Sequence, residues 1–193
     1  MTGEAVIIVM LSAADVDDPD IWVVRDGAMA EPGRLSDLAE DDIPLGKRPC
    51  VVLTPASCSA YYRVEAKGLE PLQEISVARI NAQEKAIAPV QAAACLAEDG
   101  GLMVATIDAA LLHEGLLWLE HFGLNISAVV PMGAVVKCHE TDVRRSNISG
   151  YVTLHAHDYS CADEPGMVEA LFKDIDIRTV EPEIGRASCR ERV

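Results

Sequence analysis

Short apolar runs bounded by turn-forming residues dominate the first third of the chain. Runs rich in β-branched residues predict strands at residues 6–11, 21–25, 50–53 and 61–66. The first run follows Glu4 with no lysine or arginine before it, so we interpret it as a buried strand and not as a secretion signal. Asp26-Gly27 follows the second run and predicts a hairpin turn, because glycine tolerates a positive φ. Residues 31–48, rich in proline, glycine and acids, predict an excursion over the surface.

The pattern changes to helical spacing at Pro71. Proline is favoured at the first position of a helix, where its missing N–H would have no helical partner in any case. A thin apolar stripe follows at Leu72, Ile75, Ala82 and Ala86. Pro89 then interrupts the helix, because a proline inside a helix removes a hydrogen bond. We therefore predict a second short helix over residues 90–97 and a loop over residues 98–101.

A strand, a helix and a strand are predicted next. Residues 102–107 are an apolar run of high β-propensity, and Asp108 is placed to cap the helix that follows. Gly123 ends this helix, with Leu124 in position for the apolar contact that accompanies such ends. Residues 126–130 form the next apolar run. The short joints predict a right-handed crossover between parallel strands.

A strand over residues 151–156 and a helix beginning at Glu164-Pro165 complete the predicted elements. Their order along the chain is typical of the ribonuclease-H-like unit from which actin-like folds are built. We therefore expect an α/β protein of actin-like or ribonuclease-H-like architecture, with mixed sheets, flanking helices and two small lobes. Residues 1–98 are expected to form the first lobe, with a helical segment at 71–97, and residues 99–182 the second.

The C-terminal residues 183–193 resemble the translation of a sequencing-adapter oligonucleotide. We therefore interpret them as an artefactual tail and leave them out of the fold prediction. The natural chain is expected to continue beyond about Pro182.

Charge narrows the range of partners. The chain has 31 acidic and 16 basic residues and a formal net charge of −15. Such a chain is repelled by nucleic acid and by anionic membrane surfaces, so neither is an expected partner. The cysteines before the tail are odd in number and lack C-x-x-C spacing, which favours a reducing compartment; they are Cys50, Cys58, Cys95, Cys138 and Cys161. No uncharged apolar run reaches the roughly 18 residues needed to span a bilayer.

Nucleotide hydrolysis, common among actin-like proteins, needs glycine-rich hairpins around the phosphates. Here the first predicted strand is followed by Ser12-Ala-Ala-Asp15, without glycine, and the Asp26-Gly27 turn lacks a hydroxyl residue. No cofactor is therefore expected, and an actin-like ATPase or sugar kinase is kept as an alternative. The turn at residues 54–58 contains Cys58 but lacks the sequence of a nucleophile elbow, so we interpret it as a polar loop.

A metal-binding module is the second alternative. Soft ligands gather between residues 138 and 161, at Cys138, His139, His155, His157 and Cys161. The His-x-His pair places two imidazoles on one side of a strand, but the spacing matches no established zinc module. Surface histidines and buried cysteines explain the group more simply, so no metal site is predicted.

Short motifs in a fixed order give the chain its resemblance to a known family. They are Trp22 before Asp26-Gly27, Gly33-Arg34-Leu35-Ser36-Asp37-Leu38, Val51-Val-Leu-Thr-Pro55, Tyr62-Arg63-Val64, Val104-Ala-Thr-Ile-Asp108, Leu116-Leu-Trp-Leu119, Gly123-Leu124 and Val129-Val-Pro131. Residues 151–172 fit more loosely. In this order the motifs resemble the cytoplasmic region of type II secretion system protein L.

The resemblance implies a non-enzymatic scaffold with an actin-like cytoplasmic part. In that family the scaffold recruits the secretion ATPase, protein E, to the inner-membrane platform and pairs with protein M. A membrane helix and a small periplasmic domain would follow the cytoplasmic part, so this chain is expected at the cytoplasmic face of the inner membrane. Homodimerisation is left open. We expect partner contacts on the helical segment, at the exposed side chains of Glu74, Arg79, Gln83 and Lys85, although a solvated helix face is the simpler explanation for any one of them.

Overall fold

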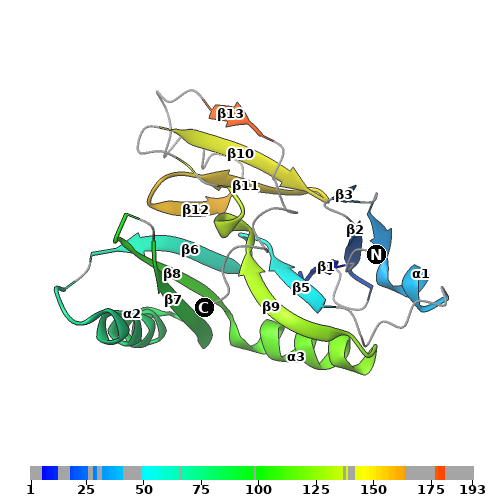
Figure 1. Cartoon of the computed structure of the whole chain (residues 1–193), viewed down its shortest axis with the longest axis horizontal. Coiled ribbons are helices and arrows are strands. Elements are labelled where there is room, and N and C mark those ends of the chain that lie inside the picture. The colour runs from blue at the N-terminus through cyan, green and yellow to red at the C-terminus, as the bar shows by residue number, and fades with distance from the viewer. Residues whose placement is uncertain are drawn as a thin grey trace. The chain divides into compact units, whose positions relative to one another are not determined.

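In the computed structural model the chain forms two sheets, and each sheet belongs to a separate compact unit (Figure 1). The structure describes residues 6–12, 18–25, 28–29, 32–40, 49–65, 67–97, 99–136, 138, 142–163 and 177–180. Of these, residues up to 54 and residues 111–130 form the first unit, and residues 55–110 and 131–180 form the second. No helix in the described part is long and apolar enough to cross a membrane.

The first unit is built around β1 (Val6–Met10), the central strand of a sheet in the order β3-β2-β1-β5-β9. The strand β2 (Asp20–Arg25) pairs antiparallel with β1, and β5 (Pro49–Thr54) pairs parallel with it. The sheet edges are β3 (Ala28–Met29) and β9 (Asn125–Pro131), while β4 (Gly33–Arg34) pairs with β2 and leads into α1 (Leu35–Glu40). The pairing of β2 with β3 confirms the predicted hairpin, whose turn, Asp26-Gly27, lies outside the described residues.

The core of the first unit lies between this sheet and α3 (Ala109–His121). Alternate residues of the β1 segment, Ile7, Val9 and Leu11, point to one face and are almost fully buried. Leu119 of α3 packs against them. Gly115 has no Cβ at the point where the Leu11 side chain lies, so the helix approaches the sheet closely.

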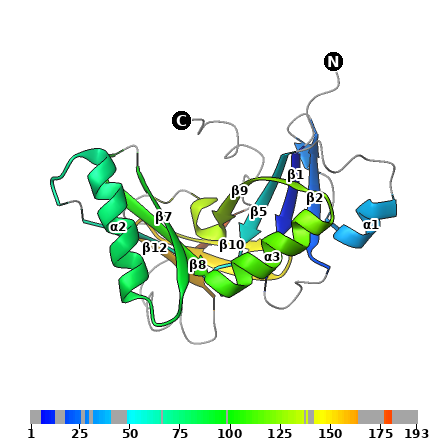
Figure 2. The same ribbon diagram turned by 90° about the horizontal axis from the view of Figure 1, so that it is seen from below.

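The second unit contains a sheet in the order β13-β10-β11-β12-β6-β8-β7. All its pairs are antiparallel except β10 with β13, which is parallel. In chain order the strands are β6 (Ser59–Val64), β7 (Val90–Leu96), β8 (Leu102–Asp108), β10 (Val143–Ile148), β11 (Tyr151–His155), β12 (Tyr159–Ala162) and β13 (Ile177–Thr179). The helix α2 (Pro71–Lys85) packs on β7 and β8 (Figure 2), and a short 3-10 helix, η2 (Met132–Ala134), follows β9.

The strands expected near residues 6–11, 21–25, 50–53, 61–66, 102–107, 126–130 and 151–156 are confirmed, as are the helices beginning at Pro71 and after Asp108. Gly123 ends α3 as predicted: its φ is 77°, and the Leu124 N–H donates to the Leu119 carbonyl at 3.2 Å. The helix predicted at Glu164-Pro165 and the tail at residues 183–193 lie outside the described residues.

The second short helix predicted at residues 90–97 is wrong, because residues 90–96 form the strand β7. All seven residues of β7 pair with β8, from Val90 opposite Asp108 to Leu96 opposite Leu102. The three alanines in this run favour a helix in isolation. Pairing along a whole neighbouring strand, together with packing under α2, outweighs that local preference.

The predicted crossover between parallel strands is also wrong. The strand β8 belongs to the second sheet and β9 to the first, so α3 carries the chain from one sheet to the other. The expected lobe boundary at residues 98 and 99 falls in the turn between the paired strands β7 and β8, inside the second unit.

Candidate functional site

The helix α2 carries all four residues at which partner contacts are predicted. Arg79 and Gln83 lie four residues apart and are both exposed. Together with Leu72 and Ser76 they form one outward stripe, because residues three or four apart share a face of a helix. The structure therefore brings two of the four predicted residues together on an accessible surface.

Glu74 is not exposed, in contrast to the prediction. Its side chain faces the sheet in the buried row formed with Ala78 and Ala82, and only 4% of the residue is exposed. The carboxylate Oε1 accepts a hydrogen bond from the backbone N–H of Leu69 at 2.8 Å. Glu74 therefore fixes the start of α2 and is unavailable to a partner.

Lys85 is exposed but lies on a different face of α2 from Arg79 and Gln83. It follows Val77 and Asn81 at helical spacing, and these side chains line a cavity of about 340 Å³ between α2 and β6. The remaining lining residues are Tyr62, Val64, Glu65, Lys67, Glu74, Ala78, Ala82 and Leu102. Glutamates and lysines are interspersed with apolar side chains here, so the cavity favours neither an anion nor a cation.

The exposed apolar side chains near α2 indicate a binding surface more clearly than the predicted polar residues do. Among the described residues seven large apolar side chains are exposed, and five of them lie in or next to α2 and β7: Leu69, Leu72, Ile80, Ile87 and Leu96. Leu72 is 80% exposed and Ile87 fully exposed. We call these five apolar side chains, together with the exposed stripe of Arg79 and Gln83 on α2, the α2–β7 surface. Several exposed apolar side chains on neighbouring elements are a typical feature of binding sites.

Sequence reasoning missed this surface because it assigned β7 to a helix. The signal that identifies β7 is Asp99-Gly100-Gly101, a turn between two apolar runs of similar length. Gly100 has a φ of 79°, which is the conformation that such a turn requires.

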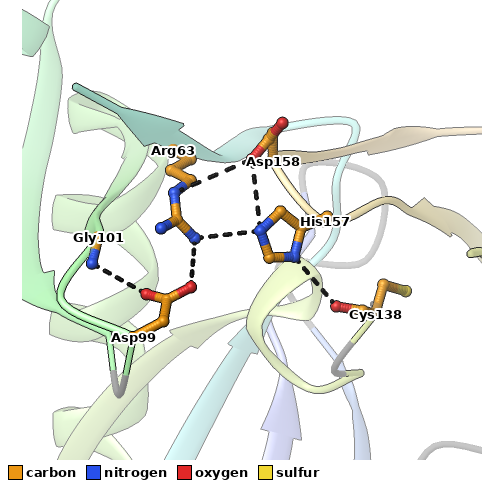
Figure 3. Close-up of polar contacts among 6 residues, drawn as sticks. All are labelled: Arg63, Asp99, Gly101, Cys138, His157 and Asp158. Carbon is orange, nitrogen blue, oxygen red and sulfur yellow. Dashed lines mark hydrogen bonds and ion pairs between the residues drawn. The ribbon is translucent and has the colours of Figure 1, made fainter. Parts of the chain in front are cut away.

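A polar cluster surrounds Asp99, in the turn between β7 and β8 (Figure 3). Arg63 Nη1 donates to Asp99 Oδ2 at 2.8 Å, and the Gly101 N–H donates to Asp99 Oδ1 at 2.9 Å. The hydrogen bond from Arg63, followed by that from Gly101, lowers the pKa of the Asp99 carboxyl to about 2. The backbone N–H of Arg63 donates to the Asp158 carbonyl at 2.6 Å, so the cluster joins this hairpin to the segment before β12.

His157 completes the cluster. Its Nε2 lies 3.2 Å from Arg63 Nη1, and its Nδ1 lies 3.3 Å from the Cys138 carbonyl oxygen (Figure 3). Since a guanidinium group only donates, Nε2 accepts from Arg63 and Nδ1–H donates to Cys138. Both ring nitrogens are therefore engaged, and neither is available to a metal.

The other soft ligands do not converge on one point either. His155 is buried and hydrogen-bonded through Nε2 to Ser146 Oγ at 2.7 Å, while the Cys138 thiol donates to the His155 carbonyl at 3.2 Å. Cys161 packs against the apolar cluster around Leu154. No three possible ligands come together anywhere in the described part of the chain, and His139 lies outside it.

The turn between β5 and β6 holds Cys58 in a structural role. Its Sγ donates to the Pro55 carbonyl at 3.4 Å, as does the Ser59 hydroxyl at 2.8 Å. Burial, with a smaller contribution from the Asp108 charge, raises the pKa of the Cys58 thiol to about 11. Cys58 is therefore a poor nucleophile at neutral pH. The segments weighed for phosphate binding, 13–15 and 26–27, lie outside the described residues.

Comparison with known proteins gives likenesses of structure but not of sequence. No protein-family model matches the sequence, and no curated protein matches it. The structure resembles the cytoplasmic domain of EpsL, an inner membrane component of the type II secretion system of Vibrio cholerae, with a TM-score of 0.71. At 15% identity the match covers 92% of this chain and 82% of that one. A PilM–PilN type IV pilus biogenesis complex matches with a TM-score of 0.50 and 13% identity, over 80% of this chain and 58% of that one.

The two mixed sheets with flanking helices confirm the expected α/β class. This chain has the fold of the EpsL cytoplasmic domain. The resemblance to protein L predicts this fold, because it implies an actin-like architecture.

Proposed function

We propose that this chain is a non-enzymatic scaffold of a type II secretion inner-membrane platform, which holds the secretion ATPase, protein E, at the cytoplasmic face of the membrane. The observation that carries the proposal is the structural likeness to the EpsL cytoplasmic domain, which extends over 92% of the chain. The motifs that resemble protein L support it independently of that likeness, because they are features of the sequence. Pairing with protein M belongs to the same proposal.

The α2–β7 surface is the part of the chain that we assign to partner binding. It combines exposed apolar side chains with the polar stripe of Arg79 and Gln83. Protein interfaces have an apolar centre with a polar rim, and this surface offers both on adjacent elements.

The experiment is a binding titration of the whole chain against the purified secretion ATPase of the same organism. We expect Leu72→Asp to weaken binding by about tenfold or more, since it places a charge in the apolar centre. Leu117→Asp is the matched control: Leu117 is also exposed, at 54%, but lies on α3 in the first unit. Absence of binding by the unmodified chain would refute the scaffold, and equal losses in both variants would refute the α2–β7 assignment.

A titration with ATP and Mg²⁺ distinguishes the scaffold from the alternative function, an actin-like ATPase or sugar kinase. The scaffold proposal expects no saturable binding in the micromolar range.

A further inference from the structure

The strand β7 is the last strand of its sheet. It pairs with β8 on one side, and no other strand among the described residues pairs with its opposite edge. Its sequence, Val-Gln-Ala-Ala-Ala-Cys-Leu, contains no charge and no proline. Natural edge strands usually carry charges or prolines, or are very short, which prevents pairing with another chain. The opposite edge of the same sheet follows that rule, because β13 has three residues and includes Arg178.

The backbone groups on the outer edge of β7 can be identified from its ends. The Ala97 N–H donates to the Gly101 carbonyl at 2.7 Å, and the Ala109 N–H donates to the Pro89 carbonyl at 3.0 Å. Because bonding alternates along an antiparallel pair, Gln91, Ala93 and Cys95 point their N–H and C=O groups toward β8. The outer edge therefore presents the N–H and C=O groups of Val90, Ala92, Ala94 and Leu96.

The helix α2 provides one wall beside this edge. Its flank with Val77 and Asn81 faces β6 across the cavity, so the opposite flank, with Leu72 and Arg79, lies toward the free edge of β7. Leu72 is 80% exposed, and Arg79 forms no ion pair with any residue that the structure describes. A strand added to β7 would cover Leu72 and bring one of its side chains close to Arg79.

A second copy of this chain fits the edge poorly. Antiparallel β7 strands of two copies would lie about 4.8 Å apart. Both α2 helices would then lie on the same face of the joined sheet, so that Arg79 of each copy faces a flank of α2, with Leu72, Ile75 and Arg79, that has no acidic side chain. An extended segment without a helix layer has no such conflict.

We propose that β7 binds an extended segment of a partner protein by strand addition, and that this segment has apolar residues at alternate positions and an acidic residue that pairs with Arg79. In this mode backbone hydrogen bonds supply affinity and alternate side chains supply specificity. The inference rests on the proposed scaffold function and specifies how its partner is held.

The test selects random heptapeptides displayed on phage against the whole chain. Enriched peptides should have alternating apolar residues and an acid. When synthetic copies bind, hydrogen exchange should slow at least about tenfold at the amides of Val90, Ala92, Ala94 and Leu96. The amides of Gln91, Ala93 and Cys95 already point to β8 and are the internal control.

Three variants sharpen the result. Ala94→Pro removes an outward N–H that β8 does not use, and Arg79→Glu reverses the charge; each should weaken the peptides about tenfold. Glu84→Lys changes a charge on another face of α2 and should leave binding unchanged. Peptides N-methylated at alternate residues should also lose binding, which tests the backbone bonds without altering the protein.

Several results would overturn strand addition: no enrichment, equal binding to Ala94→Pro and Arg79→Glu, protection elsewhere, or a dimer joined through β7. Binding of the secretion ATPase to the same variants distinguishes a failure of strand addition from a failure of the scaffold proposal. An ATPase that binds the unmodified chain and Ala94→Pro equally overturns strand addition alone, whereas an ATPase that binds neither overturns both.

Discussion

Arg63 Nη1 and Asp99 Oδ2 lie 2.8 Å apart, so that a charged pair joins β6 to the turn between β7 and β8. This pair holds the pKa of Asp99 at about 2, below its ordinary value near 3.8. Between these two pH values the unfolded chain binds more protons at this carboxyl than the folded one, so the stabilisation is lost as pH falls through the window.

Asp99→Asn is therefore expected to lower the free energy of unfolding modestly at pH 7, because the turn is exposed and solvent screens the pair. The difference from the unmodified chain should shrink as pH falls from about 4 toward about 2. Urea unfolding at several pH values measures it. Asp158→Asn is the control, since that carboxylate lies 4.0 Å from Arg63 Nε and should matter less.

Glu74→Ala should destabilise the protein by about 2 kcal/mol, because it removes the charged acceptor of the Leu69 N–H from a buried site. Glu74→Gln keeps an acceptor and should lose less. The exposed Glu84 on the same helix is the matched control, and Glu84→Ala should change the stability by no more than about 0.5 kcal/mol. Equal losses at the two positions, measured by chemical denaturation, would contradict the assigned role of Glu74.

Gly133→Ala should destabilise the protein by about 1–3 kcal/mol through overpacking. Gly133 is buried in η2, and a Cβ there would collide with the Ser160 hydroxyl and lie 2.7 Å from the Tyr61 Cβ. Gly33→Ala is the control, because the nearest atom to its new Cβ is 3.9 Å away. Thermal melts of the two variants give the comparison, and a stable Gly133→Ala protein would show that β6 and β12 are less tightly packed around η2.

His155 should make stability depend on pH. Its burial lowers the pKa of the imidazole from 6.5 to about 4, so between these values the unfolded chain binds the proton and the folded chain does not. Stability should therefore fall as pH drops from about 6.5 to about 4, with a contribution from this group of at most about 1.4 kcal/mol per pH unit. His155→Gln should have a smaller slope in the same window, as urea titrations at each pH would reveal.

The sequence alone was sufficient to predict those elements for which local signals and tertiary structure agree. Pro71 and Gly123 mark helix ends through backbone restrictions that hold in any context, and both predictions are confirmed. Apolar β-branched runs became strands because the same side chains that favour extended backbone also fill the core.

Where the sequence was insufficient, the deciding contacts come from distant parts of the chain. The alanines of β7 are strand residues only because β8 lies alongside, and β9 joins the first sheet although β8 belongs to the second. Glu74 shows the same limit within the candidate site: a glutamate in a helix is normally solvated, and its burial depends on the backbone N–H of Leu69. The sequence placed Arg79 and Gln83 on an accessible face, as the structure does. The exposed apolar side chains beside them could be recognised only once the position of β7 was known.

The interleaving of the two units has a consequence for biosynthesis. Ile7 and Val9 leave the ribosome early, but the α3 residue Leu119, which covers them, is made only after β6, α2, β7 and β8. A nascent chain therefore carries an uncovered apolar strand while β6, α2, β7 and β8 are synthesised, a state prone to aggregation and suited to capture by chaperones.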